Sequence, residues 1–209
     1  MEKLTIAAVR AWICRSADEI ERMKSYLTDL DAPIGDSDHG INMARGFSAV
    51  KAKLAGEQPS DIGALLRSVA MTLLSTVGGA SGPLYSTLFL QAALKAAGRT
   101  ELDLVGWTHC LEAGLAGVAQ RGKAVPGDKT MLDALAPAVE ALKRAKDKPL
   151  AEALAVSARA AEEGMRATIP LIARKGRASY LGERSAGHQD PGATSTHLLL
   201  KTLAGTDLG

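Results

Sequence analysis

The stretch SVAMTLLSTVGGASGPLYSTLFLQAAL, residues 68–94, contains no charged side chain. A run of this length is long enough for a membrane-spanning helix, but GGASGP at residues 78–83 interrupts it. Each apolar half is too short to cross a bilayer alone. We therefore predict a helix, a turn and a second helix, both buried in a protein core, and no membrane association.

Helical patterns extend along the rest of the chain. Apolar residues recur at spacings of four and three, which places them on one helix face, at Met43, Phe47, Val50 and Leu54. The alternation typical of strands is nearly absent. Glycine and proline residues divide the chain into eight predicted helices, near residues 3–30, 41–56, 60–75, 82–98, 101–121, 130–146, 149–174 and 192–205. The predicted fold class is all-α.

Length and composition narrow the class of protein. A chain of 209 residues fits a single domain over residues 1–209. A net charge of +2 argues against nucleic acid as the main partner. Cys14 and Cys110 lie in apolar helical patterns without a CxxC motif, so we expect buried, reduced thiols. The first residues are charged throughout and lack a signal-peptide core, which favours the cytoplasm.

Four connections differ from plain turns, at residues 31–40, 78–83, 122–130 and 175–192. Because the other connections are short, successive helices should pack antiparallel. Loops that follow alternate helices then share one end of the molecule. These four loops follow the first, third, fifth and seventh predicted helices, so we expect them to meet in space.

The loop LDAPIGDSDHGINM, residues 30–43, contains three aspartates, Asp31, Asp36 and Asp38. Three carboxylates directed at one point need a cation between them, and an all-oxygen ligand set suits Mg²⁺ or Ca²⁺. The spacing is not that of an EF-hand. An alternative for Asp38 is a plain N-cap on the helix that follows.

The other three loops are suited to binding an anion. Glycines in VGGASGPLYST, residues 77–87, lead into a helix start whose N–H groups can face a phosphate, although a tight turn explains them too. Lys129 is expected near phosphates, unless its loop only caps a helix. The lid segment, residues 175–192, is the longest connection and carries several arginines, suited to phosphoryl transfer or simply solvated.

The chain resembles the nucleotide-binding subunits L of phosphoenolpyruvate-dependent dihydroxyacetone kinases. The resemblance covers essentially the whole chain and is carried by IGDSDHGINMARGF (34–47), GGASGPLYSTLF (78–89), RGKAVPGDKTMLDAL (121–135) and GRASYLGERSAGHQDPGATS (176–195). It implies a barrel of eight antiparallel amphipathic helices with the nucleotide site at one end. It also implies a phosphotransferase that holds ADP, or ATP, with two Mg²⁺ ions.

The resemblance further assigns site residues. Asp31, Asp36 and Asp38 match the Mg²⁺ ligands, and Arg177 matches a catalytic lid arginine that reaches the phosphates. The matched nucleotide contacts are His39, Gly40, Ile41, Asn42, Ala80, Ser81, Gly122, Met131, Arg177, Asp190, Pro191 and Gly192. No nucleophile is expected on this chain.

The implied reaction is a relay between subunits. A phosphohistidine on a phosphotransferase-type subunit M phosphorylates the bound ADP, and the ATP formed phosphorylates dihydroxyacetone held on a substrate-binding subunit K. The lid sequence, and an end at Gly209 without a substrate domain, favour this relay. Two alternatives are a ketose kinase subunit that exchanges free ATP, and a nucleotide-state sensor that binds a transcription regulator. We also expect a homodimer.

Overall fold

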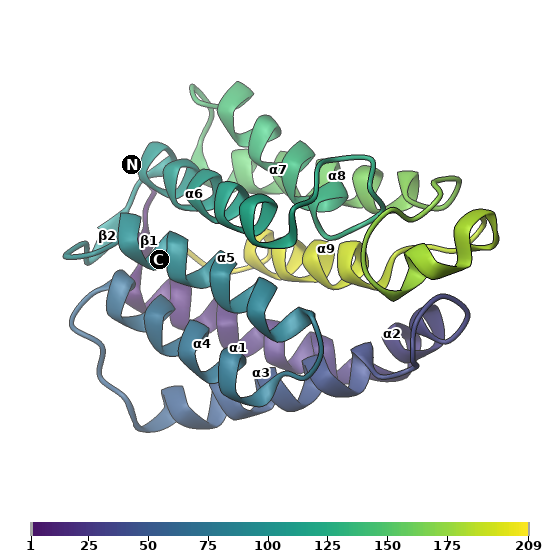
Figure 1. Ribbon diagram of the computed structural model, residues 1–209. Coiled ribbons are helices and arrows are strands. Elements are labelled where there is room, and N and C mark those ends of the chain that lie inside the picture. Colours follow the sequence, from purple (N-terminus) through teal and green to yellow (C-terminus); the bar gives the residue numbers. More distant parts are fainter. Residues whose placement is uncertain (1, 209) are drawn as a thin grey trace.

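The computed structural model describes residues 2–208 and consists of helices with almost no sheet (Figure 1). The helices are α1 (Ile6–Arg22), α2 (Lys24–Asp31), α3 (His39–Gly56), α4 (Ile62–Thr76), α5 (Ser81–Lys95), α6 (Leu104–Gly122), α7 (Leu132–Arg144), α8 (Leu150–Ala167), the 3₁₀ helix η1 (Arg177–Ser185) and α9 (Pro191–Ala204). Two short strands, β1 (Leu4–Thr5) and β2 (Glu101–Leu102), pair antiparallel. The predicted all-α class is confirmed.

Two of the predicted helices are wrong in their extent. The helix expected over residues 3–30 is divided at Met23, whose φ of −94° and ψ of 6° leave the helical region. Buried Ile13, Ile20 and Leu27 continue the same face across this break, so the apolar pattern does not reveal it. The helix expected over residues 149–174 ends at Ala167. Pro170 explains this end, because its ring lacks an N–H and restricts the residue before it.

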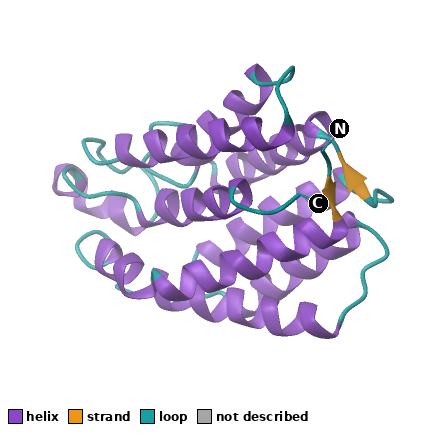
Figure 2. Ribbon diagram, turned by 180° about the vertical axis from the view of Figure 1, so that it is seen from behind, coloured by secondary structure: helices purple, strands orange, loops and turns teal. Residues whose placement is uncertain are grey.

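Neighbouring helices pack in chain order. From α3 to α9 each α-helix contacts the next, α3 also contacts α1, and α9 returns to contact α1. Seen from behind in Figure 2, the longer helices run side by side. The contacts thus close a ring, and the predicted barrel, which is a stronger statement about shape, stays a prediction.

The charge-free stretch at residues 68–94 lies in α4 and α5, which are joined by a tight turn, as predicted. At Gly82 an added Cβ would lie 2.3 Å from the carbonyl oxygen of Val77, so only glycine permits this close approach. Among residues 2–208 we find no helix with both the length and the hydropathy that crossing a bilayer requires.

A cluster of three rings joins four helices in the core. Trp12 of α1 lies edge-on to Trp107 of α6 with ring centroids 5.4 Å apart, and 6.0 Å from Phe89 of α5. The indole N–H of Trp12 donates to the carbonyl of Leu199 in α9 at 2.8 Å. Aromatic pairs in this geometry stabilise a core beyond their burial. The cluster holds α1, α5, α6 and α9 together, and three of the four polar loops border α5, α6 or α9.

Candidate functional site

The four polar loops meet at one end of the molecule around a cavity of about 390 Å³. In Figure 1 this is the end at which α2 and the lid segment lie, opposite the strand pair. The convergence expected from the helix order is therefore found. Of the residues assigned from the sequence, those that line the cavity are Asp31, Asp36, Asp38, His39, Ala80, Ser81, Gly122, Met131, Arg177, Asp190, Pro191 and Gly192.

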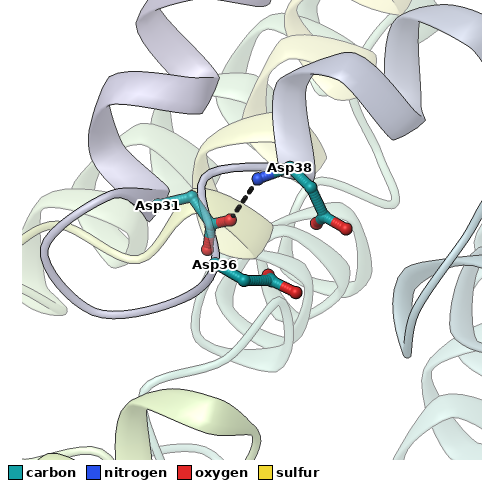
Figure 3. A group of neighbouring side chains, drawn as sticks. All are labelled: Asp31, Asp36 and Asp38. Carbon is teal, nitrogen blue, oxygen red and sulfur yellow. Dashed lines mark hydrogen bonds between the residues drawn. The ribbon is translucent and has the colours of Figure 1, made fainter.

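The three aspartates lie together between the last residue of α2, Asp31, and the start of α3 (Figure 3). One carboxylate oxygen from each of Asp31, Asp36 and Asp38 falls within 4.8 Å of the others. Asp31 is buried, Asp36 is exposed and Asp38 is partly exposed, and all three line the cavity. Three oxygen ligands this close fit a hard divalent cation such as Mg²⁺, because their mutual repulsion requires positive charge between them.

Asp31 also organises the loop. Its Oδ2 accepts the backbone N–H of Asp38 at 3.0 Å and that of His39 at 3.2 Å. Its own carbonyl accepts the N–H of Gly35 at 2.6 Å. Asp38 occupies the N-cap position of α3, as the alternative expected, but its side chain makes no capping hydrogen bond. The first N–H groups of α3 are satisfied by Asp31 from across the loop.

Arg177 brings a positive charge to the aspartates. It begins η1 directly after Gly176, which has a φ of 64° and turns the lid segment toward the cavity. Its guanidinium lies 2.8 Å from Oδ2 of Asp36, in an ion pair whose arginine side chain is 68% exposed. An exposed pair of this kind is weak. Little free energy therefore holds the guanidinium on Asp36.

His39 connects three of the segments around the cavity. One ring nitrogen, Nε2, lies 2.9 Å from Oγ of Ser195 in α9, and the other, Nδ1, lies 3.2 Å from Oγ of Ser81 in α5. Burial lowers the pKa of His39 below its usual value, so the ring is neutral near pH 7. It therefore fixes the start of α5 relative to α3 without adding charge.

Two residues of this network were missed from the sequence. Ser195 lies 2.6 Å from the hydroxyl of Tyr85, which also lines the cavity. Tyr85 follows Ser81 by four residues, so helical spacing places both on one face of α5 and gives a usable signal. Nothing local in the sequence connects Ser195 to the acidic loop.

Three predicted nucleotide contacts are not among the residues that line the cavity: Gly40, Ile41 and Asn42. Gly40 packs on α2, where an added Cβ would lie 2.1 Å from the carbonyl oxygen of Lys24. Ile41 is 47% exposed, and the side-chain oxygen of Asn42 accepts from Arg45 at 2.6 Å. The first turn of α3 thus presents only His39 to the cavity.

Lys129 lies at the cavity wall, but its ammonium is turned to backbone oxygens. It donates to the carbonyls of Thr168 at 2.8 Å, Ile169 at 3.3 Å and Leu171 at 3.1 Å, and also to that of His188. Three ammonium protons are already shared among these acceptors. Lys129 thus lies at the cavity, as expected from the loop order, with its ammonium on backbone carbonyls, and its placement near phosphates stays a prediction.

Asp190 caps α9 from inside the protein. Its Oδ2 accepts the N–H of Ala193 at 2.6 Å, and only 8% of the residue is exposed. Burial, reinforced by the nearby Asp133 carboxylate, raises the pKa of Asp190 to about 7, although Lys129 and the cap bond oppose this. The carboxyl group therefore changes charge near neutral pH.

This shift predicts a pH dependence of stability. Because the pKa of Asp190 is raised on folding, its stabilising effect is complete below pH 4 and disappears as the pH rises through about 7. Asp190→Asn keeps a capping side chain and cannot titrate. Between pH 5 and 7 the wild type should lose about 2 kcal/mol more unfolding free energy than this variant. Urea unfolding without divalent ions or nucleotide measures the difference, and parallel pH profiles would contradict it.

Comparison with known proteins identifies a family whose members this chain resembles. Residues 33–205 match the model of the DAK2 domain. The chain is 49% identical over 195 residues to the ADP-binding subunit DhaL of the PEP-dependent dihydroxyacetone kinase of Escherichia coli (strain K12), covering 92% of this chain and 93% of that subunit. It is 43% identical to the ADP-binding subunit DhaL of PEP-dependent dihydroxyacetone kinase 1 of Listeria innocua, covering 94% of each.

Solved structures of one kinase share the fold. The dihydroxyacetone kinase of C. freundii matches 98% of this chain at 27% identity, with a TM-score of 0.75 in its native form. Its complex with AMP-PNP and Mg²⁺ gives a TM-score of 0.73. This chain spans only 35% of the length of that kinase.

Proposed function

Because the chain belongs to the DAK2 domain family, among the ADP-binding DhaL subunits, we propose that it is the nucleotide-binding subunit of a dihydroxyacetone kinase. It is then a phosphotransferase component that acts with partner subunits. The substrate is dihydroxyacetone or a related ketose, held on one of those partners.

One observation carries this proposal. The aspartate trio and the glycine-rich start of α5 line the same cavity. Ala80, the N-cap of α5, makes no side-chain cap bond, so the first N–H groups of that helix have no such partner. Unpaired N–H groups at a helix N-terminus favour an anion, and carboxylates nearby favour a divalent cation. A nucleoside phosphate with Mg²⁺ supplies both charges together.

The residues of the chain divide the work of binding. Asp31, Asp36 and Asp38 would hold Mg²⁺, and the start of α5 with Ser81 would orient the phosphates. Bound Mg²⁺ supplies positive charge that offsets the charge developing on a transferring phosphoryl group. Arg177 would leave Asp36 and add a second positive group at the phosphates.

The finer proposal is a relay with retained nucleotide. ADP and two Mg²⁺ ions stay bound, the phosphoryl group comes from a phosphohistidine on subunit M, and the acceptor lies on subunit K. The PEP-dependent kinases named for the similar DhaL subunits, and the lid sequence of this chain, support it. The homodimer and the cytoplasmic location stay predictions.

The nucleotide content of the purified protein tests the relay. We expect protein prepared without added nucleotide to release near-stoichiometric ADP when it is denatured, because a retained cofactor survives purification. Chromatography of the supernatant measures it. Release of little nucleotide, together with rapid exchange of labelled ATP, would instead assign the chain to the ketose kinases that use free ATP.

A further inference from the structure

Lys129 is a charged side chain in an unusually enclosed place. Only 1% of it is exposed, and its backbone has a φ of 62°, a left-handed conformation that lysine rarely adopts. Burial lowers the pKa of its ammonium, and the nearby carboxylates of Asp190 and Asp133 oppose this. A buried charge and a strained backbone both lower the stability of a fold unless surrounding contacts compensate for them.

The surroundings of Lys129 are the two ends of one long connection. Thr168, Ile169 and Leu171 follow α8 directly, whereas His188 lies just before α9. Carbonyls that lie 17 to 20 residues apart in the chain thus accept from one ammonium. Residues 172–187, which contain η1 and most of the lid segment, lie between these two ends.

Other hydrogen bonds also join the same two ends. The N–H of Gly187 donates to the carbonyl of Ile169 at 2.8 Å, and the N–H of Asp190 donates to the hydroxyl of Thr168 at 3.0 Å. Each joins one residue of one end to one of the other. Lys129 differs because it contacts both ends from a third segment, the loop before α7. It thereby fixes the lid segment to the wall of the cavity.

We propose that Lys129 is a positioning residue, which sets the lid segment so that Arg177 faces the ligand in the cavity. This inference rests on the proposed function, because it takes Mg·ADP as that ligand. Lys129 itself contacts backbone and acts only through the segment that it holds. Arg177 lies eleven residues before His188 and enters the cavity from that segment.

Lys129→Met tests this, since methionine keeps the length and apolar stem of lysine without its charge. The matched control is Lys123→Met in the same loop, where the lysine is exposed, also has a positive φ of 48°, and does not line the cavity. We expect Lys129→Met to weaken Mg·ADP binding by about tenfold and Lys123→Met to leave it unchanged. Retained nucleotide is first removed by dialysis against a chelator of divalent ions. Isothermal titration of this nucleotide-free, folded protein, checked by circular dichroism, then gives the dissociation constants.

A double-mutant cycle separates positioning from mere stability. If Lys129 acts through Arg177, Lys129→Met should add no further loss of Mg·ADP affinity in an Arg177→Ala background. A lysine that only stabilises the fold would lower the melting temperature in both backgrounds and leave the affinity of folded protein as it was. Additive losses of affinity, or no loss, would overturn the proposal.

Chemical rescue gives a second, independent measurement. Lys129→Gly leaves the converging carbonyls without a donor, and methylammonium supplies a cation with three N–H groups. We expect methylammonium to restore most of the lost Mg·ADP affinity, and tetramethylammonium, which has charge but no N–H, to restore none. Equal effects of the two ions, or no rescue, contradict the assignment. If the wild type itself fails to bind Mg·ADP, the proposed function fails instead.

Discussion

Asp36→Asn is expected to lower the rate of phosphoryl transfer far more than about tenfold in a system reconstituted with the donor and acceptor subunits. Asparagine keeps the shape of the side chain and removes one of three negative charges. The trio loses a ligand for a divalent cation, and the charge developing on the phosphoryl group then lacks part of its counter-charge. Initial rates of dihydroxyacetone phosphorylation measure the loss, and Mg²⁺-dependent ADP binding should fall with them.

Asp18→Asn is the matched control for this variant. Asp18 also forms a single exposed ion pair, with Lys51, and neither residue lines the cavity. Removing that pair should change stability by less than about 1 kcal/mol and leave turnover as it was. If Asp36→Asn turned over at the wild-type rate, the aspartate trio would not be the metal site, whatever its geometry.

The site was predictable from the sequence to the extent that helix order determines which loops meet. Loops that follow alternate antiparallel helices lie at the same end of the molecule, and the glycine-rich and acidic segments all follow odd-numbered predicted helices. This argument survived two errors of helix extent, at Met23 and Pro170, because neither changed the direction of a helix that follows. The end of α8 shortly before Pro170 could have been predicted from the sequence, since the proline ring itself stops a helix.

The sequence could not predict hydrogen-bond partners that lie far apart along the chain. Lys129 was expected to lie near phosphates, and it does line the cavity, but its acceptors are carbonyls, which every residue carries and no motif marks. His39 likewise reaches Ser195 across 156 positions. Asp31 looked like one ligand among three, and its second task as cap of α3 depends on how the loop folds back.

That second task gives the other large effect, at Gly35. A methyl group added there would lie 2.0 Å from Oδ1 of Asp31 and 3.1 Å from its carbonyl oxygen. The carboxylate must swing away, because the side chain yields more easily than the backbone. Gly35→Ala should therefore disperse the aspartate trio without changing any charge. We expect Mg²⁺-dependent ADP affinity to fall by at least about tenfold.

The same substitution should cost little elsewhere in the fold. Losing the Asp31 bonds to the N–H groups of Asp38 and His39 removes a helix cap, which is worth about 1 kcal/mol. Gly56→Ala, at the other end of α3, has nothing within 4 Å of the added Cβ and should leave binding unchanged while stabilising the helix by roughly 0.5–1 kcal/mol. Titration of both variants with ADP, with and without Mg²⁺, separates the effects. Wild-type affinity in Gly35→Ala would mean that cation binding does not depend on where this loop holds Asp31.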